Sequence, residues 1–112
     1  MKKIEAIIRP EKLDAVRNAL GNIGCRGITV TEVEGHGKQK GLVQQWRGKK
    51  YRIELLQKVK IEVVVKDADV ERILKLIMDK ARTDKIGDGK SFVYPVENAL
   101  RIRTGEKGEG AL

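Results

Sequence analysis

The stretch Lys60-Ile61-Glu62-Val63-Val64-Val65-Lys66 aligns without a gap on Lys3-Ile4-Glu5-Ala6-Ile7-Ile8-Arg9, near the N-terminus. Both stretches are rich in apolar and β-branched residues, which is typical of buried strands. The alignment continues downstream with apolar residues at helical spacing: Val70, Ile73 and Ile77 match Leu13, Val16 and Leu20. Agreement over so many positions predicts an internal duplication of one strand followed by one helix.

Two further strands complete the predicted sheet. Residues 28–33 alternate with a period of two, and residues 91–96 follow a turn that contains glycine. The order is therefore strand, helix, strand, long loop, strand, helix, strand. This order predicts a single α+β domain over residues 1–112 with the ferredoxin-like βαββαβ plan, in which an antiparallel sheet carries both helices on one face.

Start and stop signals bound the two predicted helices. Pro10 and Glu11 open the first helix, because proline fits the first helical position and an acid there complements the helix dipole. Gly21 and Gly24 are predicted to end it. The second helix is predicted to begin after one of two residues that can cap it, Asp67 or Asp69.

The face of the sheet that the helices leave uncovered is expected to be buried by another subunit. Residues 4–8 and 61–65 are apolar on both alternations, which is typical of strands that pack on both faces. The sequence offers no further helix to cover the second face. The tail, residues 98–112, is predicted to begin as a short strand or turn and to end in flexible sequence rich in glycine and glutamate.

The composition is that of a soluble globular protein, with 40% hydrophobic and 36% charged residues. No apolar run approaches a membrane span, and the charged N-terminus lacks the apolar stretch of a signal peptide, so a cytoplasmic location is expected. The formal charge of +8 admits nucleic acid, an anionic membrane or a phosphorylated ligand as partner. Only 4% of the residues are aromatic, which leaves little for unpaired bases to stack on.

The long loop, residues 37–55, is strongly basic. A compact domain seldom carries so long a loop unless the loop has a function or is disordered. Its charge suits an anion or a partner protein better than a core. In and beside the loop a single acid, Glu54, faces seven cations: Lys38, Lys40, Arg47, Lys49, Lys50, Arg52 and Lys58.

The turn over residues 82–90 is a second candidate site. Its end, Gly87-Asp88-Gly89-Lys90-Ser91, is similar to a phosphate-binding P-loop, but Asp84 stands where that pattern needs glycine, and a strand follows where it needs a helix. Such a turn can still bind phosphate through backbone N–H groups, and an ordinary turn is the alternative. Arg101 and Arg103 lie two apart on a predicted extended segment, where they either face phosphate or form a solvated strand end.

A series of motifs occurs in order along the chain: Thr29-Val30-Thr31-Glu32-Val33, Gly35-x-Gly37-x-Gln39-x-Gly41, Arg47-Gly48-x-x-Tyr51, Lys58-Val59-Lys60-Ile61-Glu62-Val63-Val64-Val65, Gly87-Asp88-Gly89-Lys90 and Arg101-Ile102-Arg103-Thr104-Gly105. Together they resemble the PII signal-transduction proteins, the nitrogen regulators, over residues 1–112. The tail and the run Arg9-Pro10-Glu11-Lys12-Leu13 look most like archaeal members of the branch that controls ammonium channels.

The resemblance implies a homotrimer with nucleotide sites in the clefts between subunits, where ATP and ADP compete. One subunit would surround the adenosine with Ile7, Thr29, Gly35, Gly37, Lys38, Glu62 and Val64. Its neighbour would bind the phosphates with Gly87, Asp88, Gly89, Lys90, Arg101 and Arg103. Many cationic and backbone donors would thus converge on one polyanion.

The same resemblance implies a 2-oxoglutarate site that depends on ATP. Gln39 would join the nucleotide site by giving a neutral oxygen to a Mg²⁺ ion shared between 2-oxoglutarate and the ATP phosphates. Lys58 would pair with the far carboxylate, beside Lys40 and Gly41. Because ATP supports this binding and ADP does not, a carbon signal would be read in one energy state only.

The output that the resemblance implies is the long loop. In related proteins it enters the cytoplasmic mouth of an ammonium transporter and recruits the regulator to the membrane, with the residue corresponding to Arg47 in the pore; a merely solvated arginine is the alternative. Glutamine synthetase or other nitrogen enzymes are further targets. Tyr51 is the position that bacterial members uridylylate. Several residues depart from the family pattern: Trp46, Lys49, Lys50, Asp84 and Ser91. The basic Lys49 and Lys50 beside Tyr51 argue against its modification, and the extra positive charge of the loop leaves the target open.

Two other classes of function stay open on the sequence alone. A basic nucleic-acid-binding domain of the same fold predicts exposed aromatic residues on the two central strands, and residues 3–9 and 59–65 contain none. An ATPase would need a base beside the glycine turn, for which Asp88 and Glu62 are the candidates. The sequence therefore favours a sensor that is not an enzyme and that binds no nucleic acid.

Overall fold

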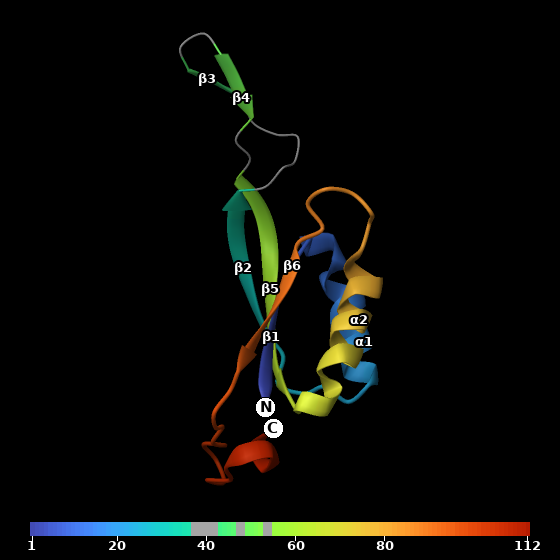
Figure 1. Cartoon of the computed structure of the whole chain (residues 1–112), viewed down its shortest axis with the longest axis vertical. Helices are drawn as coiled ribbons and strands as arrows, with labels where there is room; N and C mark the ends of the chain where they lie inside the picture. Colours follow the sequence, from blue (N-terminus) through green and yellow to red (C-terminus); the bar gives the residue numbers. More distant parts are fainter. Residues whose placement is uncertain (37–42, 47–48, 53–54) are drawn as a thin grey trace.

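The computed structural model describes residues 1–36, 43–46, 49–52 and 55–112. Its main sheet is antiparallel and has the order β2-β5-β1-β6, formed by β1 (Lys2–Ile8), β2 (Thr29–His36), β5 (Leu55–Val65) and β6 (Lys90–Pro95). The helices α1 (Leu13–Asn22) and α2 (Val70–Ala81) lie side by side on one face of this sheet (Figure 1). The predicted α+β, ferredoxin-like fold is confirmed.

The duplicated strands β1 and β5 form the centre of the sheet and most of the core. On the face toward the helices, each register pair joins two buried side chains: Ile4 with Val63, Ala6 with Ile61, and Ile8 with Val59. The helices add further buried residues: Val16, Leu20, Ile73, Ile77 and Ala81. The apolar residues that alternate along the strands thus pack against the apolar stripes of the helices in one layer. Among the described residues, no helix combines the length and the apolar character needed to cross a membrane.

The duplication includes the starts of both helices. A 3-10 turn precedes each helix, Pro10–Lys12 before α1 and Asp67–Asp69 before α2. α2 begins directly after Asp69, as predicted, but neither acidic side chain forms the predicted capping hydrogen bond. Both carboxylates bind charged partners instead: Asp67 pairs with the α-amino group of Met1 at 2.9 Å, and Asp69 pairs with Arg72 at 3.2 Å.

Gly24 ends α1, whereas Gly21 lies inside the helix. The N–H of Gly24 donates to the carbonyl of Gly21 at 3.0 Å, and the N–H of Cys25 donates to the carbonyl of Leu20 at 3.0 Å. This pair of bonds requires a left-handed residue between helix and loop, and the φ of Gly24 is +85°. Of the two glycines predicted to end the helix, one therefore does so.

The open face of the sheet, away from the helices, carries charged side chains among apolar and aromatic ones, so the expectation that both faces are apolar was only partly right. Lys3 pairs with Glu62 at 3.3 Å, and Lys60 pairs with Glu5 at 3.6 Å and with Glu62 at 3.7 Å. Strand alternation directs Ile4, Ala6, Ile8 and their partners on β5 into the core and places these four charged residues on the opposite face, with Ile7 and Val64. The open face therefore does not by itself demand an apolar cover.

A second, two-stranded sheet lies inside the segment predicted as a loop. β3 (Val43–Trp46) and β4 (Lys49–Arg52) pair antiparallel, with Val43 opposite Arg52 and Trp46 opposite Lys49. β2 and β5 also continue toward this segment, where Gly35 is paired with Leu56. Strands of four residues give too short a window for a period to be recognised, so the sequence did not predict this hairpin.

The tail after β6 folds back on itself, and its predicted flexible end was wrong. Leu100 forms an isolated bridge with Lys107, and a 3-10 helix follows at Gly108–Ala111. The predicted extended segment around Arg101 was also wrong, because the N–H of Gly105 donates to the carbonyl of Arg101 at 2.8 Å and closes a turn there. Hydrogen bonds within the tail replace the strand ladder that an extended segment would need.

Candidate functional site

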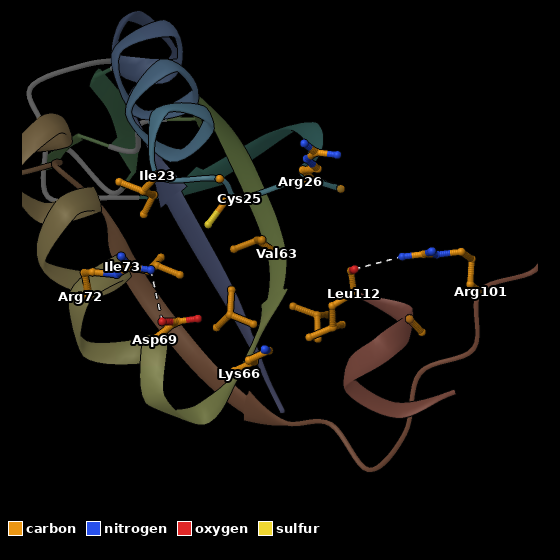
Figure 2. A pocket seen from close by; sticks show the side chains of 15 residues that line it. Ile23, Cys25, Arg26, Val63, Lys66, Asp69, Arg72, Ile73, Arg101 and Leu112 are labelled. Carbon is orange, nitrogen blue, oxygen red and sulfur yellow. Dashed lines mark hydrogen bonds and ion pairs between the residues drawn. The ribbon is translucent and has the colours of Figure 1, made fainter. Parts of the chain in front are cut away.

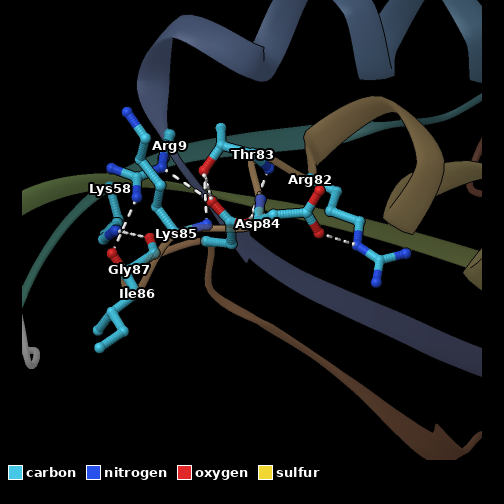
Figure 3. Close-up of polar contacts among 9 residues, drawn as sticks. Arg9, Lys58, Arg82, Thr83, Asp84, Lys85, Ile86 and Gly87 are labelled. Carbon is cyan, nitrogen blue, oxygen red and sulfur yellow. Dashed lines mark hydrogen bonds and ion pairs between the residues drawn. The ribbon is translucent and has the colours of Figure 1, made fainter.

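The 82–90 turn joins α2 to β6 and is organised by the carboxylate of Asp88 (Figure 3). The backbone N–H groups of Thr83 and Asp84 donate to Oδ2 of Asp88 at 2.7 Å and 3.0 Å. The hydroxyl of Thr83 donates to Oδ1, and Nε of Arg9 donates to the same oxygen at 3.0 Å. One carboxylate therefore ties the start of the turn to its end and to the residue that follows β1.

These contacts lower the pKa of the Asp88 carboxyl. Burial by itself would raise the pKa, but the hydroxyl and N–H of Thr83, the guanidinium of Arg9 and the N–H of Asp84 together outweigh it by stabilising the charged form. Because the pKa is lower in the folded state, the charged carboxylate stabilises the fold above about pH 4. That contribution is lost as the pH falls from there toward the lowered pKa.

Asp88→Asn is expected to lower the free energy of unfolding at pH 7 by about 2 kcal/mol, the usual value of a charged hydrogen-bond acceptor. The difference from the wild type should shrink below about pH 4, where Asp88 of the unfolded chain is protonated. Urea unfolding at pH 7 and at low pH measures both values. Asp79→Asn is the control, because Asp79 pairs only with the exposed Lys75 on α2 and should cost about 0.5 kcal/mol or less. An equal loss for Asp88→Asn at both pH values would contradict the assignment.

Gly89 packs directly on the backbone of β1. A Cβ atom at this position would lie 1.7 Å from the carbonyl oxygen of Ile7, and the φ of Gly89 is +97°. Gly87 also has a positive φ, of +104°. Only glycine fits a backbone that is both left-handed and in contact with a neighbouring strand. The glycines of the turn therefore bring its backbone within contact of Ile7.

Lys58 and Arg9 hold the outer part of the same turn. Nζ of Lys58 donates to the carbonyl of Gly87, and Nη2 of Arg9 donates to the carbonyl of Ile86 at 2.9 Å. Lys90, the first residue of β6, lies opposite Ile7 in the register of β1 and β6. We call this group the turn end of the sheet, and its members are Ile7, Lys58, Gly87, Asp88, Gly89 and Lys90.

A second group of predicted site residues lies toward the other end of the same strands. Thr29 and Glu62 are directly opposite each other in the register of β2 and β5. They form the last pair of this register, so β2 does not pair with the residues of β5 after Glu62. The next residues of β5 border a cavity of about 530 Å³, which is lined by Val64 and Arg101 among others (Figure 2). We call this group the tail end of the sheet, and its members are Thr29, Glu62, Val64 and Arg101.

The tail-end cavity has an apolar wall and a basic rim. Apolar side chains from both layers line it: Ile23, Val63, Val65, Ile73 and Leu112. Charged residues also line it: Arg26, Lys66, Arg101, and Arg72 with its partner Asp69. Figure 2 shows Leu112 and Arg101 on the tail side of the cavity, across from Val63 and Ile73. An aromatic base with an anionic substituent would match such a lining.

The two ends divide the predicted site residues differently from the expectation. Ile7 was expected on one subunit and Gly89 on its neighbour, but the two are in contact within one chain. Arg101 was expected beside the glycine turn, but it lines a cavity with Val64 of its own chain. β6 runs from the 82–90 turn to the tail and separates the two groups (Figure 1). Within one chain the fold therefore groups these residues by their place on the sheet and not by ligand portion, and which subunit supplies each of them to a ligand stays a prediction.

The remaining predicted residues contribute less to this picture. Gly35 pairs with Leu56 near the turn end, and Arg103 is an exposed residue of the tail turn. The backbone of Tyr51 lies in β4. The other predicted residues lie outside the described residues: Gly37, Lys38, Gln39, Lys40, Gly41 and Arg47.

Two residues of the site were missed by sequence reasoning. Arg9 was read only as the end of a strand, although it binds both Asp88 and Ile86. Glu106 was read as part of a flexible tail, although its carboxylate pairs with Arg101 at 3.0 Å. No sequence pattern around either residue indicates its contact. The contacts of Arg9 join segments that only the fold brings together, and the contact of Glu106 depends on the turn of the tail.

Comparison with known proteins identifies the relationship. The family model named Nitrogen regulatory protein P-II matches residues 1–106. The chain is 57% identical over 112 residues to the nitrogen regulatory protein P-II of Rhodospirillum rubrum, and 57% identical to that of Azospirillum brasilense, with both chains covered completely in each case. It is 54% identical over 112 residues to nitrogen regulatory protein P-II 2 of Methanothermobacter thermautotrophicus, which covers 97% of that relative.

These matches confirm the family resemblance that the motifs indicated, while the archaeal, channel-regulating branch stays a prediction. The family model covers the strands and helices of the fold and both ends of the sheet. The relatives match along the full length of the chain at more than half of all positions. The chain therefore belongs to the nitrogen regulatory protein P-II family, whose members are signalling proteins of nitrogen metabolism.

Proposed function

We propose that the protein is a sensor of nitrogen, carbon and energy state that binds ATP or ADP between neighbouring chains and, together with Mg-ATP, 2-oxoglutarate. The observation that carries this proposal is the separation of the predicted nucleotide-binding residues into a turn end and a tail end. Each end alone offers only part of a nucleotide site. A site with all of these residues needs the turn end of one chain and the tail end of another.

Identical chains can bring these ends together when the turn end of each chain contacts the tail end of its neighbour. Two different surfaces meet, so the interface is heterologous, and such contacts close into a ring when the rotation between chains permits it. A ring of three chains would contain three equivalent nucleotide sites. The need to complete the site therefore supports a closed ring of chains, and the proposed number of three comes from the family resemblance.

The turn end is suited to phosphate. The left-handed Gly87 and Gly89 leave backbone N–H groups without side chains in front of them, and such groups bind anions. Lys90 adds a cation at the start of β6. A polyanion would bind there through charge-assisted hydrogen bonds.

The tail end is suited to the adenosine and to one side of the phosphates. Past Glu62 the described residues place no strand beside the outer edge of β5, so the backbone of Val64 is available to the edge of a base. The cavity beside it has apolar walls. Arg101 on its rim would reach phosphates held by the turn end of the neighbouring chain, with Arg103 from the same turn.

Lys58 connects the nucleotide site with the proposed site of 2-oxoglutarate. Its ammonium group lies at the carbonyl of Gly87, so a dicarboxylate bound to Lys58 would lie beside the phosphates. Among the described residues, no three His, Cys, Asp or Glu side chains are placed to bind a metal. A Mg²⁺ ion bound mainly through ATP phosphates and water, with one oxygen from Gln39, fits this donor set.

The long loop, residues 37–55, would carry the output to a target. Its cations suit an acidic surface or the mouth of a pore. The proposed target is an ammonium transporter, and glutamine synthetase or another nitrogen enzyme is a further one. The protein would act in the cytoplasm and reach the membrane through the transporter. Regulation by binding requires no catalysis, and the two central strands, β1 and β5, carry ion pairs on the open face where a nucleic-acid binder would present aromatic rings.

Calorimetric titration tests the proposal. Mg-ATP and ADP should each bind the wild-type protein, and 2-oxoglutarate should then bind the ATP-loaded form only. Equal binding of 2-oxoglutarate to the ADP-loaded form would contradict the dependence on energy state. Absence of any nucleotide binding would contradict the proposed function as a whole.

Arg47→Ala tests the proposed output separately. The variant should bind ATP, ADP and 2-oxoglutarate as the wild type does, because Arg47 belongs to neither ligand site. Its affinity for the transporter should fall by at least about tenfold, the effect expected when a central arginine of an interface is removed. Co-purification with the transporter in detergent measures the complex. An unchanged complex would exclude Arg47 as the residue in the pore.

A further inference from the structure

Arg101, which the proposed function assigns to the phosphates, already holds an anion in this structure. Its Nη1 donates to Oε1 of Glu106 at 3.0 Å, and its Nη2 donates to the carbonyl oxygen of Leu112 at 3.1 Å. Both acceptors belong to the tail that follows Arg101 in the same chain. The guanidinium therefore makes two hydrogen bonds, on different nitrogens, with oxygen atoms of its own tail.

The tail turn directs Glu106 toward this guanidinium. The N–H of Arg101 donates to the carbonyl of Glu106 at 2.8 Å, and the bridge between Leu100 and Lys107 pairs the flanking residues. The hydroxyl of Thr104 donates to Oε1 of Glu106 at 2.9 Å. The carboxylate is thus held in place by the backbone ladder and by a second side chain, and it is not a chance neighbour of Arg101.

The same tail occupies the rim of the cavity beside Val64. Ala111 and Leu112 line this cavity together with Arg101 (Figure 2). A tail folded around Arg101 therefore contacts the arginine that is proposed to bind phosphate. The same tail also forms one edge of the cavity that is proposed to bind the base. One rearrangement of the tail would change both parts of the tail end.

We propose that Glu106 is an internal competitor of the nucleotide phosphates for Arg101 and so sets the nucleotide affinity of the tail end. The inference rests on the proposed nucleotide site. Carboxylate and phosphate bind a guanidinium through the same pair of N–H groups, so Arg101 exchanges one anion for the other when the nucleotide binds. The tail, no longer held through Glu106 and Leu112, then moves away from the cavity.

The expected size of the effect follows from the exposure of the pair. The side chains of Arg101 and Glu106 are 37% and 48% exposed, so solvent screens their attraction. Exposed ion pairs of this kind change an equilibrium by up to about fivefold. Glu106→Gln keeps the shape of the side chain and removes its charge, and it should tighten the binding of both ATP and ADP by about threefold to fivefold.

Glu109→Gln is the matched control, because it removes the same charge from the same tail, and Glu109 is not placed against Arg101. Its nucleotide affinity should equal that of the wild type. A double-mutant cycle completes the test: in an Arg101→Ala background, at protein concentrations high enough to measure the weaker binding, Glu106→Gln should have no effect. Fluorescence titration with a labelled nucleotide measures all five proteins.

Each outcome decides the proposal. Tighter binding that requires both the loss of Glu106 and the presence of Arg101 supports it. Unchanged affinity in Glu106→Gln, an equal gain in Glu109→Gln, or a gain that persists without Arg101 would each overturn it while leaving the nucleotide site intact. Failure of the wild type to bind any nucleotide would overturn both the competition and the proposed function.

Discussion

Gly89→Ala should unfold the protein more easily than any other single change of a glycine in the 82–90 turn or in the tail. The added Cβ would lie 1.7 Å from the carbonyl oxygen of Ile7 and 2.8 Å from its carbonyl carbon. These are backbone atoms of a central strand and cannot move aside as a side chain can. Overpacking costs about 1–3 kcal/mol and a left-handed φ about 1–2 kcal/mol, so the free energy of unfolding should fall by about 2–5 kcal/mol.

Gly24→Ala measures the cost of a strained, left-handed backbone without the cost of a close contact. Gly24 has a φ of +85°, similar to the +97° of Gly89, but a Cβ there would meet nothing within 4 Å. Its substitution should therefore cost only the strain, about 1–2 kcal/mol. Urea unfolding of both variants measures the difference. Equal costs would mean that Gly89 does not pack against β1 in solution.

The same contact gives Gly89→Ala a functional consequence. To relieve the contact, the turn must move away from Ile7, and its backbone N–H groups then leave the positions proposed for the phosphates. ATP and ADP affinities should fall by at least about tenfold in the fraction that remains folded, because charge-assisted hydrogen bonds depend strongly on geometry. Gly21→Ala is the control for this effect, because Gly21 lies inside α1, a Cβ there would meet nothing within 4 Å, and both nucleotides should bind normally.

Lys58→Ala should remove the response to 2-oxoglutarate and leave ADP binding nearly intact. Losing one partner of a hydrogen-bonded charge pair at a binding site costs about 2–5 kcal/mol, which corresponds to a loss of affinity of about 30-fold or more. The proposed ADP contacts do not include Lys58. Loss of its bond to Gly87 should loosen the turn only slightly, because Asp88 and Arg9 hold it independently.

Lys75→Ala controls for the change in net charge, since Lys75 is an exposed residue of α2 that pairs with Asp79. Calorimetric titration of both variants with ADP, and with 2-oxoglutarate after Mg-ATP, gives the comparison. A loss of both ligands to the same extent in Lys58→Ala would show that Lys58 supports the turn and does not bind the dicarboxylate.

The fold could be predicted because its pattern is repeated. The alignment of residues 3–9 with 60–66 determined the two central strands, and the helical spacing that follows determined both helices. Even the 3-10 turns Pro10–Lys12 and Asp67–Asp69 occupy equivalent positions. Two copies of one unit reinforce each other, so errors of a few residues at element ends did not change the topology.

Features without a repeated or periodic signal could not be predicted. The open face looked apolar because valines and isoleucines stand beside Lys3, Glu5, Lys60 and Glu62, and only the register assigns these charges to one face. The tail looked flexible because its sequence is rich in glycine and glutamate. Its order comes from the contacts of Arg101 with Glu106 and Leu112, which join positions that no periodicity connects.

The motifs named most of the candidate site but not its arrangement. Ile7 and Gly89 are far apart in sequence and in contact in the fold, whereas Gly87 and Arg101 are close in sequence and separated by the length of β6. The grouping by ligand portion therefore separated residues that are in contact within one chain and joined residues that are not. The division into a turn end and a tail end follows from the register of the sheet. That register depends on pairing between segments that are far apart in the sequence.

Mixed oligomers test most directly whether the nucleotide site is shared between two chains. Lys90→Glu should inactivate the turn end and Arg101→Glu the tail end, so neither variant alone should bind ATP, although each should assemble as the wild type does. Co-expression in equal amounts should restore binding at about one site in four, because one chain then supplies an intact turn end and its neighbour an intact tail end. Equilibrium dialysis with labelled ATP counts the sites. Mixed oligomers that bind no ATP would contradict a site built from two chains.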